Sequence, residues 1–471
     1  MGKKDKRDIK NYRAVAIANT ISNVFCGIIK DKMTTIIEEE ELISEEQNGF
    51  RKDRRGTENL YILKELIEEE EKEEKQLFCV FLDIEKAYDT VNRQLMWELV
   101  ERQGFDEHIR KILKSMYRNT MATYHWNDLT TEEVKSEIGL RQGCTLSPLL
   151  FMFIMEELTQ RVKKTGVGVK IGEEILNVLL FADDVVLLTE TWEDMKILLE
   201  EVGIFSEDLE MKFGIDKCKA MVINEKKEKG SQNELQLLGR DIERVDVFKY
   251  LGLEIDKKGL VNERNKLRKK AEKMYGIING KINFRVNKYE VIRGLWKGLA
   301  VPTIMYGLEV IDIGGKEKRG LEIVQHRAAR KGLRANRHVA TEDSRGEMGW
   351  STFQERIDQS KIQYRIRLEY MNNKRWARKI FKWKGRKSSF RKETNRAMKC
   401  LDMKIVNNGE EIDIKIKGEK LKVKLNKWKR NMDKKKSLRW CRNKDKPCNE
   451  KYAMAHGSRR YYSKPGQTPW R

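Results

Sequence analysis

The sequence contains no run of roughly 18 or more consecutive apolar residues, the minimum for a membrane-spanning helix. Its lysine-rich start, Met1 to Tyr12, has no apolar segment of the kind that a secretory signal needs. Cysteine is also scarce. The seven cysteines, an odd number, are scattered along the chain, which indicates reduced thiols rather than a disulfide framework. These absences predict an intracellular protein without a membrane span, in the nucleus or the cytoplasm.

Positive charge is abundant. The 471 residues carry a formal net charge of +23, and the isoelectric point is near 9.5. Such an excess favours a polyanionic partner, and nucleic acid before a membrane surface. The length allows two or three domains with a sizeable core.

The most informative stretch is Phe181-Ala182-Asp183-Asp184, which lies between two short apolar runs of strand character. This pattern predicts a hairpin with two carboxylates at its turn. Carboxylates held close to apolar strands cost several kcal/mol unless a cation or donors compensate them, and a divalent ion with oxygen ligands would do so. A surface hairpin that merely uses aspartate as a turn former is an equally good interpretation of this stretch alone.

Two further segments favour the metal site. Leu77–Ile84 is an apolar strand, expected to be buried on both faces, and it carries Asp83. Residues 139–148 form a glycine-containing loop, with Ser147 expected as N-cap and Pro148 as the first residue of an apolar helix. Phosphoryl transfer from a nucleotide needs carboxylates from separate strands that bridge two metals. Two adjacent strands that carry one and two aspartates would supply that geometry.

Other elements follow from periodicity. Thr57 is expected to cap a helix that ends in a solvated acidic run, 68–74. A hairpin is expected around residues 127–128, a strand at 220–223, and a strand or hairpin at 248–255. Helices are expected near 21–41, 93–103, 106–118, 192–209, 261–279, 289–307 and 316–334, with more inside 351–384.

Taken together, these motifs resemble those of reverse transcriptases, and in particular those of non-LTR (LINE-like) retrotransposons. The resemblance spans about residues 8–340. Leu82–Thr90 resembles the A motif, Gly139–Pro148 the B motif, Phe181–Asp184 the C motif, Asp216–Lys219 the D motif and Tyr250–Leu253 the E motif. Asn11–Arg13 and Asn48–Arg51 resemble the N-terminal finger motifs, and Trp296–Tyr306 resembles the thumb.

The resemblance implies an α+β fold of the right-hand polymerase type. Fingers and a palm with an antiparallel sheet would occupy residues 1–255, a helical thumb 256–340, and a helical, basic C-terminal region 341–471. It also implies an RNA-directed DNA polymerase that extends a primer 3′-OH with dNTPs on an RNA template. Two Mg²⁺ ions would serve as cofactors, and Mn²⁺ could replace them. The implied partners are the RNA template, a DNA primer or target, and dNTPs.

Residue roles carry over as expectations. Asp83, Asp183 and Asp184 match the catalytic carboxylates, and the metal-binding positions are Asp83, Ile84, Asp183 and Asp184. Lys217 matches a lysine proposed to protonate leaving pyrophosphate, although an ordinary surface lysine is the alternative. Tyr88 matches a steric gate that selects dNTPs, although a plain core tyrosine is the alternative. Gln142 and Gly143 match the segment that lines the incoming nucleotide. Arg51 is the expected triphosphate contact, since a guanidinium binds phosphate bidentately.

The chain also departs from the family pattern. Ala14 and Thr145 stand where proline is usual, and no endonuclease pattern is evident, so a truncated element is one interpretation. A silent remnant that only binds nucleic acid is therefore the alternative function. Cys441, Cys448 and His456 lack the fourth ligand of a closed zinc site. The basic, tryptophan-containing segment 373–446 fits either an RNA-binding surface or a small helical core.

Overall fold

The computed structural model describes residues 15–126, 128–224, 234–280, 287–336, 338–385, 388–400, 403–408 and 411–416. They form two compact units. The first holds the described residues up to Gly252, with Asp256–Gly259 and Lys374–Trp383; the second holds the rest. Residues 260–373 belong to one unit. None of the helices in the described part of the chain has the length and apolar character needed to cross a membrane.

The first unit combines helices with a mixed sheet, which confirms the predicted α+β class. Its helices are α1 (Thr20–Glu39), α2 (Gly56–Glu73), α3 (Arg93–Arg102), α4 (Glu107–Tyr117), α5 (Ser147–Lys164), α6 (Trp192–Asp208) and α13 (Trp376–Lys384), the last residue of which falls in the second unit. Its main strands are β1 (Leu77–Leu82), β8 (Val178–Phe181), β9 (Asp184–Thr189), β10 (Lys219–Ile223) and β13 (Glu243–Arg244).

Shorter strands complete this unit. They are β2 (Met121–Ala122), β3 (His125–Trp126), β4 (Leu129–Thr130), β5 (Val134–Lys135), β6 (Val169–Ile171), β7 (Glu174–Leu176), β11 (Gln236–Leu237), β12 (Arg240–Asp241) and β14 (Val247–Tyr250). Strand β15 (Leu253–Asp256) follows β14. The expected hairpin around 127–128 is present as the antiparallel pair β3 and β4.

Strand β1 lies at the centre of the five-stranded sheet, whose order is β13-β10-β1-β9-β8. It pairs antiparallel with both β10 and β9, and all six of its residues are buried. The expectation of a strand buried on both faces is therefore confirmed. Such burial explains the continuous apolar run, because neither face of β1 requires polar side chains.

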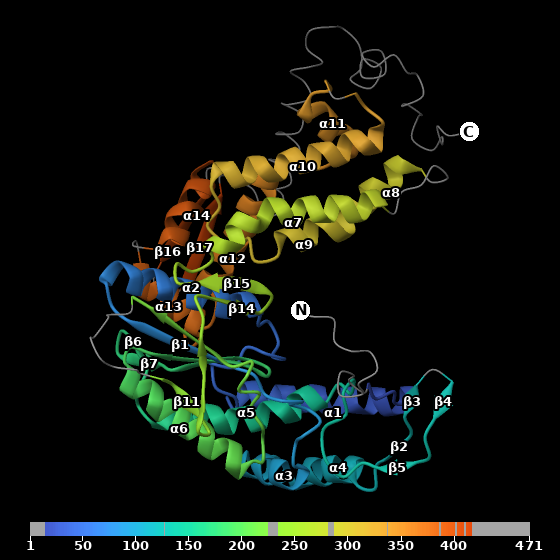
Figure 1. Cartoon of the computed structure of the whole chain (residues 1–471), viewed down its shortest axis with the longest axis vertical. Coiled ribbons are helices and arrows are strands. Elements are labelled where there is room, and N and C mark those ends of the chain that lie inside the picture. The colour runs from blue at the N-terminus through green and yellow to red at the C-terminus, as the bar shows by residue number, and fades with distance from the viewer. Residues whose placement is uncertain are drawn as a thin grey trace. The chain divides into compact units, whose positions relative to one another are not determined.

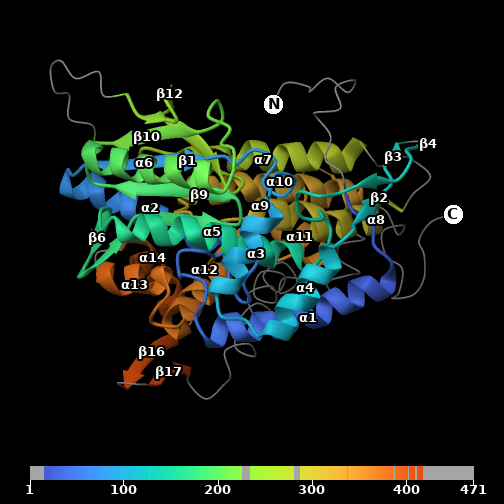
Figure 2. The ribbon, with the colours of Figure 1, turned by 90° about the horizontal axis from the view of Figure 1, so that it is seen from below.

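Helices cover both faces of this sheet. Helix α2 packs on one face, and α5 and α6 pack on the other (Figure 1). Figure 2 looks onto the α5 side, where α1, α3 and α4 contribute to the same apolar core. Helix α5 is buried almost all round, as its apolar sequence predicted.

Two local expectations need correction. The cap of α5 is Leu146, and Ser147 is already helical; its hydroxyl lies 3.2 Å from the Tyr117 hydroxyl instead of capping the helix. The acidic end of α2 is solvated only in part: residues 71–74 are exposed, as expected, but Glu69 and Glu70 are buried. Burial, together with the Glu190 carboxylate, raises the pKa of Glu70 to about 7.

The second unit is mainly helical. Its elements are α7 (Val261–Gly280), α8 (Lys288–Leu295), the π-helical turn η2 (Trp296–Ala300), α9 (Val301–Met305), α10 (Gly315–Leu333), α11 (Thr341–Met348), α12 (Phe353–Tyr370), α14 (Ser389–Cys400), β16 (Met403–Asn408) and β17 (Glu411–Ile416). Of the expected helical C-terminal region, the structure describes helices up to Cys400 and then the hairpin of β16 and β17.

A buried tryptophan pair anchors this unit. Trp296 stacks on Trp350 with ring centroids 5.6 Å apart, and its indole N–H donates to Gln325 Oε1 at 3.1 Å. Gln325 in turn donates to the Ser351 carbonyl at 3.0 Å. Because buried indole and amide groups must be hydrogen-bonded, these contacts fix η2 and α10 in one register.

Candidate active site

Strand pairing brings the three predicted aspartates to one end of the sheet. Strands β1 and β9 are antiparallel neighbours, with Leu82 paired to Val185. Asp83 follows β1 directly, whereas Asp184 opens β9 and pairs with Phe181 across the turn. Asp183 lies in that turn. The predicted hairpin, with its carboxylates at the turn and beside Asp83, is therefore present.

The electrostatics of this cluster indicate uncompensated negative charge. Loss of solvation, and then the Asp183 and Asp83 carboxylates, raise the pKa of Asp184 to about 6. Lys217 Nζ lies 2.6 Å from Asp83 Oδ2 and compensates that carboxylate. Hard oxygen ligands with excess negative charge fit a divalent cation. Among the described residues, however, no three His, Cys, Asp or Glu side chains are already closed around a common point.

The segment 212–218, which contains part of the D motif, forms hydrogen bonds with the backbone of Asp83. The Gly214 N–H donates to the Asp83 carbonyl at 2.8 Å, and the Asp83 N–H donates to Cys218 Sγ at 3.4 Å. A Cβ at position 214 would lie only 3.0 Å from Asp83 Oδ2. Ile84, the fourth expected metal-binding position, is buried and forms a β-bridge with Phe213. Glycine at position 214 thus allows this segment to approach the A motif.

Tyr88 lies near the turn, since the Asp183 carboxylate acts on its hydroxyl. Its ring stacks on Phe151 of α5, with centroids 5.1 Å apart. Burial, and then the Asp183 carboxylate, raise the pKa of the Tyr88 hydroxyl well above its usual value. Because Tyr88 is only half-buried, it belongs to the rim of the site as well as to the core.

The B-motif residues Gln142 and Gly143 are joined to the A motif. Gln142 Nε2 donates to Asp89 Oδ1 at 2.8 Å, and its backbone carbonyl accepts from the Ala16 N–H at 2.6 Å. Gly143 has a φ of +104°, and a Cβ there would lie 2.9 Å from the Ala16 carbonyl. The glycine is therefore required for this close approach of the N-terminal segment.

Arg51 occupies a different environment, and its expected contact with a triphosphate needs correction. Its side chain is 3% exposed and forms an ion pair with Glu38 at 2.9 Å. Nη1 also donates to the carbonyls of Ile43 and Ser44, at 3.1 and 2.8 Å. The hydrogen-bond donors of the Arg51 guanidinium are therefore used in contacts within the fold. Lys52 and Arg55 are the exposed cations of this loop.

A buried amide network beside the turn was missed from the sequence. Gln47 Oε1 accepts from the Ala182 N–H at 3.0 Å. Asn59 Nδ2 donates to the Leu180 carbonyl and to the Tyr250 hydroxyl, both at 3.0 Å, and Asn59 Oδ1 accepts from Asn48 at 2.6 Å. The sequence around Gln47 and Asn48 does not indicate such a contact, because the turn that they reach is far away in the chain.

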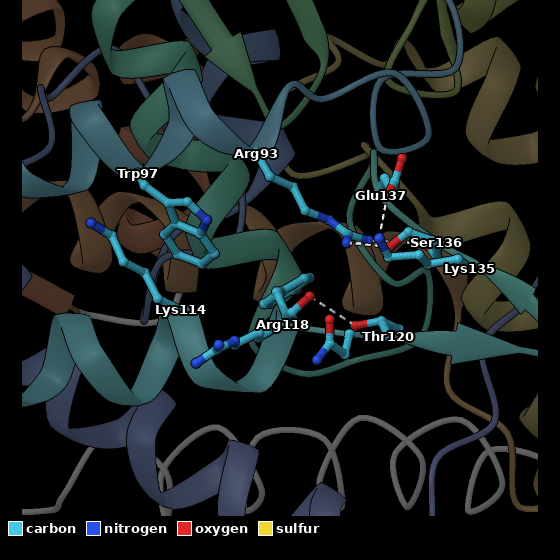
Figure 3. Close-up of a pocket in the computed structure, with 10 residues that line it drawn as sticks. Arg93, Trp97, Lys114, Arg118, Thr120, Lys135, Ser136 and Glu137 are labelled. Carbon is cyan, nitrogen blue, oxygen red and sulfur yellow. Dashed lines mark hydrogen bonds and ion pairs between the residues drawn. The ribbon is translucent and has the colours of Figure 1, made fainter.

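Arg93 fixes the entry to the B-motif loop. It donates to the Gly139 carbonyl at 2.8 Å and to the Ser136 carbonyl at 2.5 Å. Figure 3 shows this side chain in a pocket of about 250 Å³. The residues that line this pocket are Arg93, Trp97, Lys114, Tyr117, Arg118, Asn119, Thr120, Lys135, Ser136 and Glu137. Three exposed cations face solvent here, so the pocket adds positive charge to the first unit.

The second unit carries a basic groove of about 470 Å³, formed by α7, α8 and the C-terminal half of α10. The residues that line it are Tyr275, Lys288, Arg327, Arg330, Lys331, Arg334 and Ala335. None of these described lining residues is acidic. Arg327, Lys331 and Arg334 form the exposed stripe of α10, whereas Ala328 and Leu333 face the core. Such a concentration of cations attracts a polyanion.

Comparison with known proteins agrees with this geometry. Residues 2–255, more than half of the chain, match the family described as reverse transcriptase (RNA-dependent DNA polymerase). The chain belongs to this family. Within it, the predicted membership of the non-LTR retrotransposon reverse transcriptases is confirmed by the curated relatives.

One such relative is the Pol polyprotein of retrotransposable element R2 from Nasonia vitripennis, 29% identical over 51% of this chain and 24% of that protein. The R2DM polyprotein of Drosophila melanogaster is 24% identical over 54% of this chain and 24% of that protein. The RNA-directed DNA polymerase from mobile element jockey is 23% identical over 72% of this chain and 37% of that protein.

The reverse transcriptase chain therefore spans about a quarter of the length of the R2 polyproteins.

Among solved structures, apo telomerase from Candida tropicalis is similar, with a TM-score of 0.40 and 8% identity over 80% of this chain and 58% of that one. That likeness is too distant to define the fold. The possible zinc ligands Cys441, Cys448 and His456 lie outside the described residues, as do residues 417–446 of the basic segment 373–446.

Proposed function

We propose that the chain is an RNA-directed DNA polymerase that extends a primer 3′-OH with dNTPs on an RNA template. The observation that carries this proposal is the meeting of Asp83, Asp183 and Asp184 at one end of β1 and β9. Membership of the reverse transcriptase family supports it. In this proposal the first unit contains the palm and fingers of a right-hand polymerase, and the helices from α7 onward contain the thumb.

The acidic cluster supports a divalent metal site. Asp83, Asp183 and Asp184 would hold two Mg²⁺ ions, or Mn²⁺ in their place, with the backbone of Ile84 beside them. Such ions, when bound, activate an attacking hydroxyl and stabilise the leaving pyrophosphate. The raised pKa of Asp184 supports this assignment, because the clustered carboxylates leave negative charge that a cation would compensate.

Side chains of the protein would carry out the remaining tasks. The Lys217 side chain is 63% exposed and its ammonium lies beside Asp83, so this flexible side chain can turn to donate a proton to the leaving pyrophosphate. The Tyr88 ring, supported by Phe151, would crowd a 2′-OH and so select dNTPs. Gln142 and Gly143 would line the incoming nucleotide from the B-motif side.

The proposal is tested by dNTP incorporation on poly(rA)/oligo(dT) with Mg²⁺, comparing the wild-type chain with Asp183→Asn. The variant keeps the size of the side chain and removes a charge, and we expect incorporation to fall to background. Incorporation that survives the substitution would refute the assigned site. A folded wild-type chain that binds the duplex and incorporates nothing would instead support the nucleic-acid-binding remnant.

The basic groove of the second unit supports an RNA contact. Arg327, Lys331 and Arg334 follow one another along α10 at helical spacing, and Lys288 lies on the opposing helix α8. Cations arranged in this way neutralise successive backbone phosphates. The groove has a volume of about 470 Å³, and the proposed ligand is the phosphate backbone of the RNA.

Salt dependence of RNA binding tests this contact. For the double variant Arg327→Gln and Lys331→Gln, we expect the slope of log K against log[salt] to fall in magnitude by about one to two. Arg319→Gln is the matched control, because Arg319 is an exposed cation of the same helix outside the groove. Equal slopes in the double variant and the wild type would remove the groove from the interface.

A further inference from the structure

The loop at residues 46–49 extends the sheet beside the catalytic turn. Gln47 forms a parallel β-bridge with Leu180 of β8. The Leu180 N–H donates to the Glu46 carbonyl at 2.9 Å, and the Asn48 N–H donates to the Leu180 carbonyl at 3.0 Å. The backbone of the loop is thereby registered to β8, one residue before Phe181.

This register places the Gln47 side chain on the turn itself. Gln47 Oε1 accepts from the Ala182 N–H at 3.0 Å and from the Gly49 N–H at 2.7 Å. Gln47 Nε2 donates to the Ala182 carbonyl at 3.4 Å. The side chain is buried, at 1% exposure, so water does not replace these partners. Both ends of the amide therefore hold the backbone of one turn residue.

That turn residue has an unfavourable conformation. Ala182 has a φ of +62°, which is the left-handed region that residues with a Cβ rarely adopt. Such a conformation persists where the surroundings impose it. Gly49 is part of the surroundings, because a Cβ at that position would lie 2.1 Å from the Ala182 nitrogen. The loop 46–49, and not the preference of alanine, holds the turn.

We propose that Gln47 is a positioning residue for the reaction. By fixing Ala182 in its left-handed conformation, its amide aims the carboxylates of Asp183 and Asp184 at the metal-binding position beside Asp83. This inference rests on the proposed metal site. A positioning role differs from a merely structural one. In a structural role Gln47 only satisfies buried backbone groups, and replacing any buried amide beside the same strand would have the same effect.

Asn177 provides the matched control for that distinction. It is 2% exposed and immediately precedes β8, at the opposite end from the turn. Its Nδ2 donates to the carbonyls of Val162 and Val167 at 2.9 and 3.0 Å. Replacing Gln47 or Asn177 by leucine removes a buried amide that bonds to backbone, but only Gln47 touches the catalytic turn.

The full chain is compared as wild type, Gln47→Leu and Asn177→Leu. The readouts are kcat on poly(rA)/oligo(dT), the Mg²⁺ concentration for half-maximal rate, and Mn²⁺ affinity by electron paramagnetic resonance. For Gln47→Leu we expect about tenfold weaker metal affinity and a lower kcat, as for residues that orient metal ligands. For Asn177→Leu we expect a lower melting temperature with unchanged metal dependence.

Wild-type metal dependence in folded Gln47→Leu, or an equal shift in Asn177→Leu, would overturn the positioning role. If Gln47→Leu does not fold, Gln47→Met keeps the length of the side chain without the amide, and the same shift in metal dependence is expected. Mn²⁺ affinity also separates the two proposals. An inactive wild type refutes the polymerase, while weaker Mn²⁺ binding by Gln47→Leu still supports the positioning of the turn.

Discussion

Loss of solvation at Asp184, together with the neighbouring carboxylates of Asp183 and Asp83, predicts that Asp184→Asn stabilises the protein in the absence of divalent metal. The pKa of Asp184 rises from 3.8 to about 6 in the folded chain. Between these values the folded state binds more protons than the unfolded state. The free energy of unfolding therefore falls as pH rises through this window, and the loss is complete above pH 6.

The size of the effect follows from the shift. Roughly two pH units correspond to about 3 kcal/mol for a fully buried group. Asp184 keeps part of its surface exposed to solvent, and solvent screening reduces this to about 1 kcal/mol. For a unit of this size we expect the melting temperature of Asp184→Asn at pH 8 to exceed that of the wild type by about 2–4 °C. Near pH 4 the difference should disappear.

Differential scanning calorimetry in the presence of EDTA measures this difference. Asp128→Asn is the control, since Asp128 lies on the exposed hairpin between β3 and β4 and is likewise accessible. Added Mg²⁺ should raise the melting temperature of the wild type and leave Asp184→Asn unchanged. A variant that is no more stable than the wild type at pH 8 would show that the three carboxylates do not repel one another as described.

Three further predictions concern single side chains. Lys217→Gln should lower kcat about 100-fold with little change in the KM for dNTP, if Lys217 donates the proton; pre-steady-state incorporation measures this, and a rate within twofold of wild type would exclude that role. Tyr88→Ala should relax discrimination against ribonucleotides by about tenfold, whereas Tyr88→Phe should not, and competition between dNTP and rNTP shows whether it does. Arg51→Ala should destabilise the chain by about 3 kcal/mol by leaving Glu38 and two carbonyls without their partner, with an unchanged KM for dNTP; a raised KM at unchanged stability would restore the triphosphate contact.

The central strands could be predicted because their sequences have a single good interpretation. Residues 77–82 form a continuous apolar run that fits a strand buried on both faces, and Asp183 and Asp184 fall between two more such runs. Adjacent strands of one sheet then bring Asp83 beside them. Tyr88 could be placed for the same reason, because it follows Asp83 in one short segment.

Other features depend on contacts that no local pattern contains. Gln47 acts on Ala182, which is 135 positions away, through a register that only the folded sheet defines. Arg51 belongs to a basic loop whose composition is the same whether its guanidinium meets Glu38 or a ligand. The acidic end of α2 was expected in solvent. The burial of Glu69 and Glu70 could not be predicted because it depends on which neighbours pack against the helix.

The most direct test of the central claim is metal binding by the carboxylates themselves. Electron paramagnetic resonance titration of Mn²⁺ measures it, with a chain-terminated primer on an RNA template and the next dNTP present. We predict that the wild type binds Mn²⁺ at pH 8 and binds it more weakly below pH 6, as Asp184 takes up a proton. Asp83→Asn and Asp183→Asn should each lose this binding. Equal Mn²⁺ affinity in the wild type and both variants would contradict the account.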